Sequence, residues 1–309
     1  MIKLPETAVF EITYACNHAC LFCSCPWEEP GAIRGREMSV ADWQSAASEW
    51  ISHGVRNVVL SGGEPLLKEG VEDLLLFLAS ELYKVHGMSH ELQFFSNGTL
   101  VAGETLRLLK SCSAVFSTSL PSIFDYKRQT GTGYDFRTVL KQVCAASEMG
   151  IRTSVGIALT RTVLPELYEI LSYAFLCGAG TVMLNPFRPS GRGSMHPEFL
   201  LTKEDIQQAL STAEEVCQTS KGAVWIGGEY SPALVDPAMF PHLHFSTNCP
   251  AGKNLLVISP DGMVRGCEHD SRTLCRWNEW RTLENNPLWQ EFCCDDRPVC
   301  PLFPDKGSN

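Results

Sequence analysis

No part of this 309-residue sequence is an uninterrupted apolar run of about 18 residues, the length that a membrane-spanning helix needs. The start, MIKLPETAVFEIT, also lacks the basic-then-apolar order of a secretory signal. We therefore expect neither a membrane span nor export, and we predict a cytoplasmic protein.

Basic residues are in the minority, with 25 Lys and Arg against 35 Asp and Glu. The net charge is -10 and the pI is near 5.3. Such a charge repels polyanions, which argues against non-specific binding to nucleic acid. It mildly favours a cationic or neutral partner.

Cysteine, by contrast, is abundant, with 14 residues. A disulfide scaffold is typical of small exported chains that cannot build a core, and this chain is long and carries no export signal. Ligation of a metal or an iron–sulfur cluster is the better explanation for many of these cysteines.

Short β-rich apolar runs alternate with amphipathic stretches of helical length from residue 8 to about 185. Six repeats of this kind predict the α/β class, with a parallel sheet covered by helices. The strand candidates are AVFEIT (8–13), RNVVLS (56–61), ELQFFS (91–96), AVFSTSL (114–120), RTSVGIAL (152–159) and GTVMLN (180–185). The helix candidates are 39–53, 70–84, 103–111, 134–148 and 165–177, the first with Ser39 as a capping residue.

The alternation stops after PFRPSGRG (186–193). One helix (202–218) and one strand (223–227) follow, and then the hairpin sequence LLVISPDGMVRG, centred on a Pro-Asp-Gly turn. We predict three parts: a barrel over 1–193, a linking helix and strand over 194–245, and a cysteine-rich domain over 246–309.

The segment CNHACLFC places Cys16, Cys20 and Cys23 in a C-x3-C-x2-C spacing directly after the first predicted strand. Three thiolates on one loop can each bind a different iron of a [4Fe-4S] cube and leave the fourth iron open to a small molecule. A closed zinc site is the alternative, and Cys25 or His18 would be its fourth ligand.

The segment GGEP (Gly62 to Pro65) follows the second predicted strand, and an aromatic residue, Phe22, precedes the third cysteine of the motif. FFSNGT (94–99) and STSLPS (117–122) follow the third and fourth strands. Together these segments resemble those of the radical S-adenosylmethionine (radical SAM) superfamily. The resemblance implies a partial (β/α)6 TIM barrel over roughly residues 5–190 and a S-adenosylmethionine (SAM) site. The cofactor-binding residues that it implies are Phe22, Gly62, Gly63, Glu64, Pro65, Ser96, Asn97 and Ser119.

The arrangement C-x12-G-x4-C formed by Cys249, Gly262 and Cys267 resembles the opening of the SPASM or twitch extension of that superfamily, which holds auxiliary clusters. The rest of a full SPASM pattern is missing, so we expect one auxiliary [4Fe-4S] cluster in a small C-terminal domain. Its candidate ligands, besides Cys249, are Cys267, Cys275, Cys293, Cys294 and Cys300. The isolated cysteines on predicted helices fit buried apolar positions: Cys112, Cys144, Cys177 and Cys217.

The motif layout resembles most the radical SAM epimerases of natural products, of the neomycin C epimerase kind, which invert a ring carbon of an aminoglycoside. In this interpretation Cys249 donates a hydrogen atom to the substrate radical. The C-x12-G-x4-C spacing gives Cys249 the alternative role of a cluster ligand. The partners would be a small cationic substrate and an electron donor such as flavodoxin or ferredoxin. Carboxylates available for ammonium groups are Glu11, Glu28, Glu29, Asp125, Glu229 and Asp236.

Three other functions remain open. A peptide-modifying enzyme would form a crosslink or a D-residue, although a barrel that starts by residue 8 leaves little room for an N-terminal leader-recognition domain. An alcohol dehydrogenase of the same layout would use every auxiliary thiol for the cluster. An electron carrier or zinc module would have no use for a GGEP segment.

Overall fold

The computed structural model describes residues 3–220, 222–227, 235–245 and 249–293. The chain forms two compact units, each assembled from segments far apart in the sequence. Of the described residues, unit 1 contains 3–17, 25–116 and 250–293, and unit 2 contains 18–24 and those between 117 and 249. These units cut across the predicted division at residues 193 and 245, which stays a prediction.

Unit 1 is built on six strands with the hydrogen-bonded order β11-β10-β9-β1-β2-β3. The strands β9, β1, β2 and β3 are parallel, and β10 runs antiparallel to both β9 and β11. The bounds are β1 (Thr7–Glu11), β2 (Asn57–Ser61), β3 (Glu91–Phe95), β9 (Leu255–Ile258), β10 (Met263–Arg265) and β11 (Cys275–Arg276). β4 (Val115–Ser119) begins in unit 1 and ends in unit 2.

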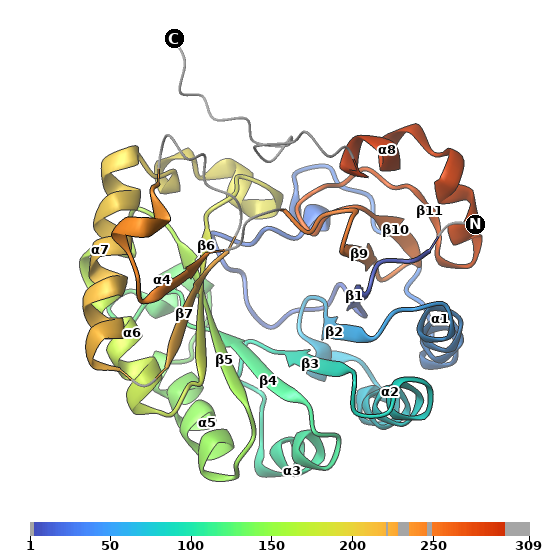
Figure 1. Cartoon of the computed structure of the whole chain (residues 1–309), viewed down its shortest axis with the longest axis horizontal. Coiled ribbons are helices and arrows are strands. Elements are labelled where there is room, and N and C mark those ends of the chain that lie inside the picture. The colour runs from blue at the N-terminus through green and yellow to red at the C-terminus, as the bar shows by residue number, and fades with distance from the viewer. Residues whose placement is uncertain (1–2, 221, 228–234, 246–248, 294–309) are drawn as a thin grey trace. The chain divides into compact units, whose positions relative to one another are not determined.

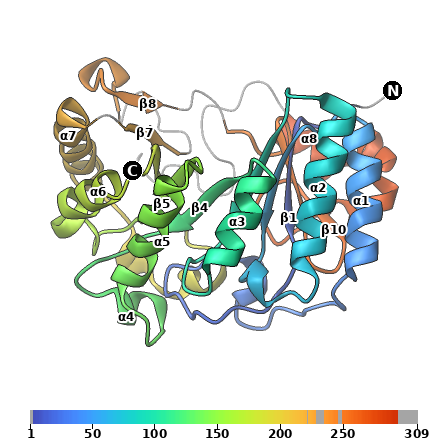
Figure 2. The same ribbon diagram turned by 90° about the horizontal axis from the view of Figure 1, so that it is seen from below.

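The helices of unit 1 begin and end close to the predicted limits. Ser39 caps the first helix, as predicted, and exchanges hydrogen bonds with Asp42 in a capping box. α1 and α2 lie side by side on one face of the strands β1 to β3 (Figure 1; Figure 2). The bounds are α1 (Val40–Ser52), α2 (Val71–His86), α3 (Gly103–Ser111) and α8 (Pro287–Cys293), with 3-10 helices η1 (Pro26–Glu28), η2 (Pro65–Leu67) and η7 (Trp277–Asn285).

Large aromatic side chains form the core between β1 and α1. Trp43 and Trp50 are seven residues apart, so they lie on the same helix face, and both are fully buried. Their rings pack on Phe10 of β1 with centroids 5.3 and 6.5 Å away. The indole N–H of Trp50 donates to the carbonyl of Trp277 at 3.0 Å, which attaches η7 to the same helix.

The predicted C-terminal hairpin is confirmed as β9 and β10. Its turn closes through a hydrogen bond from the Gly262 N–H to the Ser259 carbonyl (2.8 Å), and Gly262 has a φ of +84°, which favours glycine. β9 also pairs in parallel with β1, with Thr7 opposite Leu255 and Phe10 opposite Ile258. The hairpin therefore extends the sheet of unit 1, an association that local sequence patterns did not indicate.

Unit 2 contains four parallel strands in the order β5-β6-β7-β8. The strands are β5 (Thr153–Leu159), β6 (Thr181–Pro186), β7 (Ala223–Ile226) and β8 (Leu243–Phe245). The helices are α4 (Tyr126–Thr130), α5 (Phe136–Glu148), α6 (Leu167–Leu176) and α7 (Lys203–Thr219), with 3-10 helices η3 (Leu164–Glu166), η4 (Gly191–Met195), η5 (Pro197–Phe199) and η6 (Pro237–Met239). None of the helices in the described parts of either unit is long and apolar enough to cross a membrane.

Candidate active site

The three-cysteine loop follows β1, as predicted. Cys16 belongs to unit 1 and is exposed, whereas Cys20 and Cys23 belong to unit 2 and are half-buried. The N–H of Cys23 donates to the Cys20 carbonyl at 3.2 Å, which closes a turn between these two ligand candidates. None of the three thiols is buried in a hydrophobic core, so each is accessible enough to serve as a ligand.

Two segments of unit 2 hold the part of the loop that carries Cys20 and Cys23. On one side, the N–H groups of Ala19 and Leu21 donate to the carbonyls of Thr130 and Gln129 at 2.8 and 2.9 Å. On the other side, the Gly193 N–H donates to the Cys23 carbonyl (3.0 Å). The Arg192 guanidinium likewise donates to the Cys20 carbonyl (3.1 Å). Phe22, between these cysteines, is half-buried.

In unit 1, the GGEP segment lies alongside the residues that lead into Cys16. The pairing of β1 with β2 continues beyond both strands, because Gly63 N donates to the Thr13 carbonyl (2.8 Å) and Glu64 N to the Ala15 carbonyl (2.7 Å). A Cβ atom on Gly63 would lie 2.2 Å from the Ala15 carbonyl oxygen, and one on Gly62 would lie 2.9 Å from that of Thr13. Only glycine permits this close approach of the two backbones.

The carboxylate of Glu64 connects the GGEP segment to the loop after β3. It is completely buried and accepts hydrogen bonds from the Ser96 hydroxyl (2.8 Å), the Asn97 N–H (2.8 Å) and the Leu66 N–H (3.2 Å). Burial raises the pKa of Glu64, while these three hydrogen bonds lower it. Glu64 and Ser96 therefore have a structural role within unit 1, and their contact with a cofactor stays a prediction.

A ring of three polar side chains joins the same loop to the residue after Cys16. The Asn97 amide donates to the Asn17 amide oxygen (2.7 Å), Asn17 donates to the Thr99 hydroxyl (3.0 Å), and Thr99 donates to the Asn97 amide oxygen (2.6 Å). The ends of β1, β2 and β3 thus meet around Asn17. Asn17 and Thr99 were not predicted as site residues, because their partners are about eighty positions away and no local pattern marks them.

Glu37 is a second residue that sequence patterns did not identify. Its carboxylate accepts hydrogen bonds from the Thr13 hydroxyl (2.9 Å), the Tyr14 N–H (2.7 Å) and the Lys68 ammonium (2.8 Å). Partial burial would raise the pKa of Glu37, but these bonds outweigh it and hold the pKa below its ordinary range. Glu37 therefore fixes the strand end that precedes Cys16.

The predicted residue Ser119 ends β4 and is half-buried in unit 2. The loop that follows it is held by the buried carboxylate of Glu166, which accepts from the Ser122 hydroxyl (2.6 Å) and from the N–H groups of Ile123 and Phe124 (2.9 and 2.8 Å). This anchor gives the STSLPS segment a defined conformation beside the end of β4.

His18, one of the two alternative fourth ligands of a zinc site, lies among aromatic side chains. His18 is buried, and its ring packs against Tyr126 and Tyr134 with centroids 6.4 and 6.3 Å away. Burial lowers the pKa of His18 to about 4. Within the described ranges, no three His, Cys, Asp or Glu side chains gather closely enough to hold a single metal ion.

The C-terminal cysteines have different environments. Cys267 is buried just beyond β10 and Cys275 lies on β11 in unit 1, whereas Cys249 belongs to unit 2. Burial raises the pKa of the Cys275 thiol to about 11, and the Thr282 side chain is its hydrogen-bond partner. Cys293 ends α8, but its side chain lies outside the described part of the chain, as do Cys294 and Cys300.

Several carboxylates predicted to bind a cationic substrate have partners within the protein. Glu11 pairs with Arg265, Glu28 with Arg34 (2.5 Å) and Asp125 with Arg128 (3.3 Å). Asp236 caps η6. Glu29 is half-buried, and Glu229 lies outside the described residues.

The sequence profile of the Radical SAM superfamily matches residues 10–174, more than half of the chain. Among relatives, the antilisterial bacteriocin subtilosin biosynthesis protein AlbA of Bacillus subtilis (strain 168) is 24% identical over 318 residues, which cover 97% of this chain and 66% of AlbA. The mycofactocin maturase MftC of Mycobacterium tuberculosis (strain CDC 1551) is 26% identical over 283 residues, which cover 86% of this chain and 65% of MftC. The chain thus spans about two thirds of the length of these relatives.

Two solved structures share the fold. Streptococcus suis SuiB bound to its precursor peptide SuiA has a TM-score of 0.71 at 14% identity, covering 96% of this chain and 66% of SuiB. The enzyme anSMEcpe with bound AdoMet also has a TM-score of 0.71, at 15% identity, covering 94% of this chain and 82% of its own. The likeness confirms the predicted fold class, mixed α/β with a parallel sheet of the partial-barrel type.

Proposed function

Because the chain belongs to the radical SAM superfamily, we propose that it modifies a peptide substrate by radical chemistry. The family brings two cofactors, a [4Fe-4S] cluster and SAM. When bound, they supply a 5′-deoxyadenosyl radical that removes a hydrogen atom from a substrate carbon. The observation that carries the proposal is the position of GGEP against the loop that leads into Cys16, together with relatives named for a bacteriocin and as a maturase and a similar structure bound to a precursor peptide.

The residues of this chain fit those cofactors. We assign Cys16, Cys20 and Cys23 as the cluster ligands, because three accessible thiols on one loop leave one iron without a protein ligand. The glycines of GGEP let its backbone pack directly against residues 13–15, which fixes GGEP beside the residues that lead into Cys16. The hydrogen bond between the Asn97 and Asn17 amides holds these strand ends in place.

The peptide alternative is better supported than the predicted aminoglycoside epimerase. AlbA is named for the biosynthesis of a bacteriocin, and a further relative, 22% identical over 309 residues, is named PqqA peptide cyclase. SuiB has been solved with a precursor peptide. Glu11, Glu28 and Asp125 already pair with arginines of the protein, which weakens the additional argument for a cationic sugar from acidic side chains.

The first test uses reconstituted protein, SAM and dithionite with two substrate sets: a library of unprotected 12-residue peptides and a panel of aminoglycosides. We expect peptides, and not aminoglycosides, to raise 5′-deoxyadenosine above the substrate-free background. Replacing Cys16, Cys20 or Cys23 with Ala should abolish cofactor cleavage, whereas Cys217→Ala, a buried helix position, should not. Turnover of an aminoglycoside with no response to peptides would refute the proposal.

The second test concerns Cys249, which we propose as the hydrogen donor for an inverted residue. Thiol protons exchange with solvent, so in deuterated water the modified peptide should gain one deuterium. Cys249→Ala should keep hydrogen abstraction but lose the inverted product. If the variant instead loses about four irons, Cys249 is a cluster ligand. A product lighter by two hydrogens would then indicate a crosslink.

A further inference from the structure

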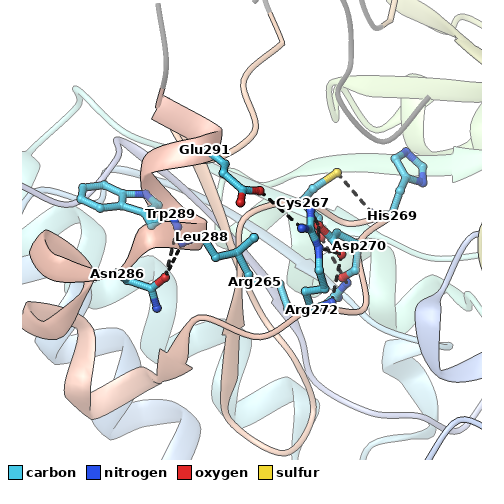
Figure 3. A network of polar contacts seen from close by, with 9 residues as sticks. All are labelled: Arg265, Cys267, His269, Asp270, Arg272, Asn286, Leu288, Trp289 and Glu291. Atoms are coloured by element: carbon cyan, nitrogen blue, oxygen red, sulfur yellow. Dashed lines mark hydrogen bonds and ion pairs between the residues drawn. The ribbon is translucent and has the colours of Figure 1, made fainter. Parts of the chain in front are cut away.

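Arg265, the last residue of β10, is the centre of a buried polar network in unit 1 (Figure 3). Only 2% of its surface is exposed, yet its guanidinium uses all three nitrogen atoms as donors. Nε donates to the Ser259 hydroxyl (2.8 Å), Nη2 donates to the Glu11 carboxylate, and Nη1 donates to the carbonyls of Cys267 (3.2 Å), Glu268 (3.1 Å) and Asp270 (2.9 Å). One cation thereby gathers three carbonyl groups of the turn that carries Cys267.

The orientation of these carbonyls has a consequence for the sulfur of Cys267. In a planar trans peptide the C=O and the N–H point in opposite directions. The Glu268 carbonyl and the His269 N–H belong to the same peptide; its oxygen accepts from Arg265, and its N–H donates to Cys267 Sγ at 3.4 Å. A single peptide group therefore connects the guanidinium to the sulfur, and the buried cation polarises it so that the N–H becomes a better donor.

Two further contacts keep this turn in place. Glu11 ends β1 and is only 4% exposed, so its pairing with Arg265 ties the turn to the strand that leads into Cys16. Asp270 also accepts from Arg272 (2.8 Å), which reaches Glu291 on α8 (3.4 Å; Figure 3). A buried ion pair costs desolvation and is seldom the most stabilising choice. A role in orienting the turn explains why one is present here.

We propose that Arg265 is a positioning residue for Cys267. It orients the 267–270 turn so that an amide N–H points at the sulfur and stabilises Cys267 as a thiolate ligand of the auxiliary cluster, while Glu11 holds the guanidinium. Amide hydrogen bonds to ligand sulfur atoms raise the reduction potential of iron–sulfur clusters. The proposal rests on the radical SAM chemistry of the proposed function and on the auxiliary cluster that the C-x12-G-x4-C resemblance implies, and it is independent of the substrate.

The test compares iron content and spectra of anaerobically reconstituted variants. The wild type should hold about eight irons, two cubes of four. The iron content of Arg265→Gln should fall to about four irons per chain, while the spectroscopic signal of the SAM-binding cluster and its response to SAM stay unchanged. Arg265→Lys keeps the positive charge but loses the planar guanidinium with its several N–H donors, so it should lower the midpoint potential of the auxiliary cluster. Arg276→Gln, at an exposed arginine of the strand β11 that pairs with β10, is the matched control and should match the wild type.

A double variant keeps the proposal refutable if Arg265→Gln fails to fold. Glu11→Leu with Arg265→Met replaces the buried pair by apolar groups of similar size, which proteins often tolerate. We expect this variant to remain folded, at a lower denaturant midpoint than the wild type because the carbonyls of the 267–270 turn lose their donor, and to lose the auxiliary cluster. About eight irons and an unchanged potential in that variant would overturn the proposal. So would a wild type with only about four irons, a result that leaves peptide-dependent SAM cleavage untouched.

Discussion

Replacing Gly63 with alanine tests how closely the candidate site depends on backbone contact. Gly63 follows β2, and its N–H donates to the Thr13 carbonyl at 2.8 Å, while the next N–H, that of Glu64, donates to the Ala15 carbonyl at 2.7 Å. The added Cβ would lie 2.2 Å from the Ala15 carbonyl oxygen and 2.7 Å from its carbon. Because both neighbours are backbone atoms, no side-chain rotation can relieve the clash.

The size of the effect follows from these contacts. Separating the two backbones breaks two part-buried hydrogen bonds at about 1 kcal/mol each, and the strain of overpacking adds about 1–3 kcal/mol. We therefore expect the free energy of unfolding to fall by about 3–5 kcal/mol, a large part of the stability of an ordinary domain. The shift also moves the residues that lead into Cys16, so SAM affinity and iron retention should fall together.

Urea unfolding of the apoprotein measures the stability, and equilibrium dialysis of the reconstituted protein measures SAM binding. Gly103→Ala is the matched control, since it lies at the start of α3 in the same unit and its added Cβ would only touch an Arg107 side chain at 3.6 Å. The control should stay within about 1 kcal/mol of the wild type. If Gly63→Ala unfolds and binds SAM as Gly103→Ala does, the close approach has no role in the site.

Three further predictions concern single side chains. Glu64→Gln should lower the free energy of unfolding by about 1–3 kcal/mol in urea, because an amide nitrogen replaces one of the buried acceptor oxygens that serve Ser96 and Asn97. The pKa of Glu37 is lowered in the folded state, so its ionised carboxylate should stabilise the fold fully above the unfolded pKa near 4.5. This stabilisation should disappear as the pH falls through the folded-state pKa. The difference in free energy of unfolding between wild type and Glu37→Gln, measured from pH 7 to pH 3, should therefore close in acid. Cys275→Ala should retain both clusters by iron analysis, since this thiol lies on β11 and has the Thr282 side chain as its hydrogen-bond partner, and loss of about four irons would show that it is a ligand.

Local patterns predicted the strands and most helices well because each has a strong signal of its own. β1, β2 and β3 begin and end within two residues of the predicted limits, and α1 begins after its predicted cap Ser39. The patterns did not predict α4, whose five residues lack a periodic face, or the short strand β8. The parallel pairing of β9 with β1 was also missed, because it joins segments about 250 residues apart.

The residues of the candidate site also fall into two groups, those that local patterns identify and those that they do not. Cysteine spacing and GGEP are contiguous motifs, so the sequence alone could identify them. The residues that orient them were not identifiable, because each acts on a distant segment: Asn17 on Asn97, Glu37 on Lys68, and Arg265 on Glu11. A single sequence carries no record of such pairs, and only the folded chain brings them together.

Glu11 is an example of how an unidentified partner, Arg265, misled the prediction of a cationic substrate. As a lone acidic residue at a strand end it was a reasonable candidate for binding an ammonium group, and the net charge of -10 supported the same idea. In the structure its carboxylate is buried against Arg265, where a second cation would have to displace a guanidinium that also bonds to three carbonyls. The acidic composition therefore says little about the substrate. A peptide, which needs no cationic group to be recognised, fits the chain at least as well as a cationic sugar does.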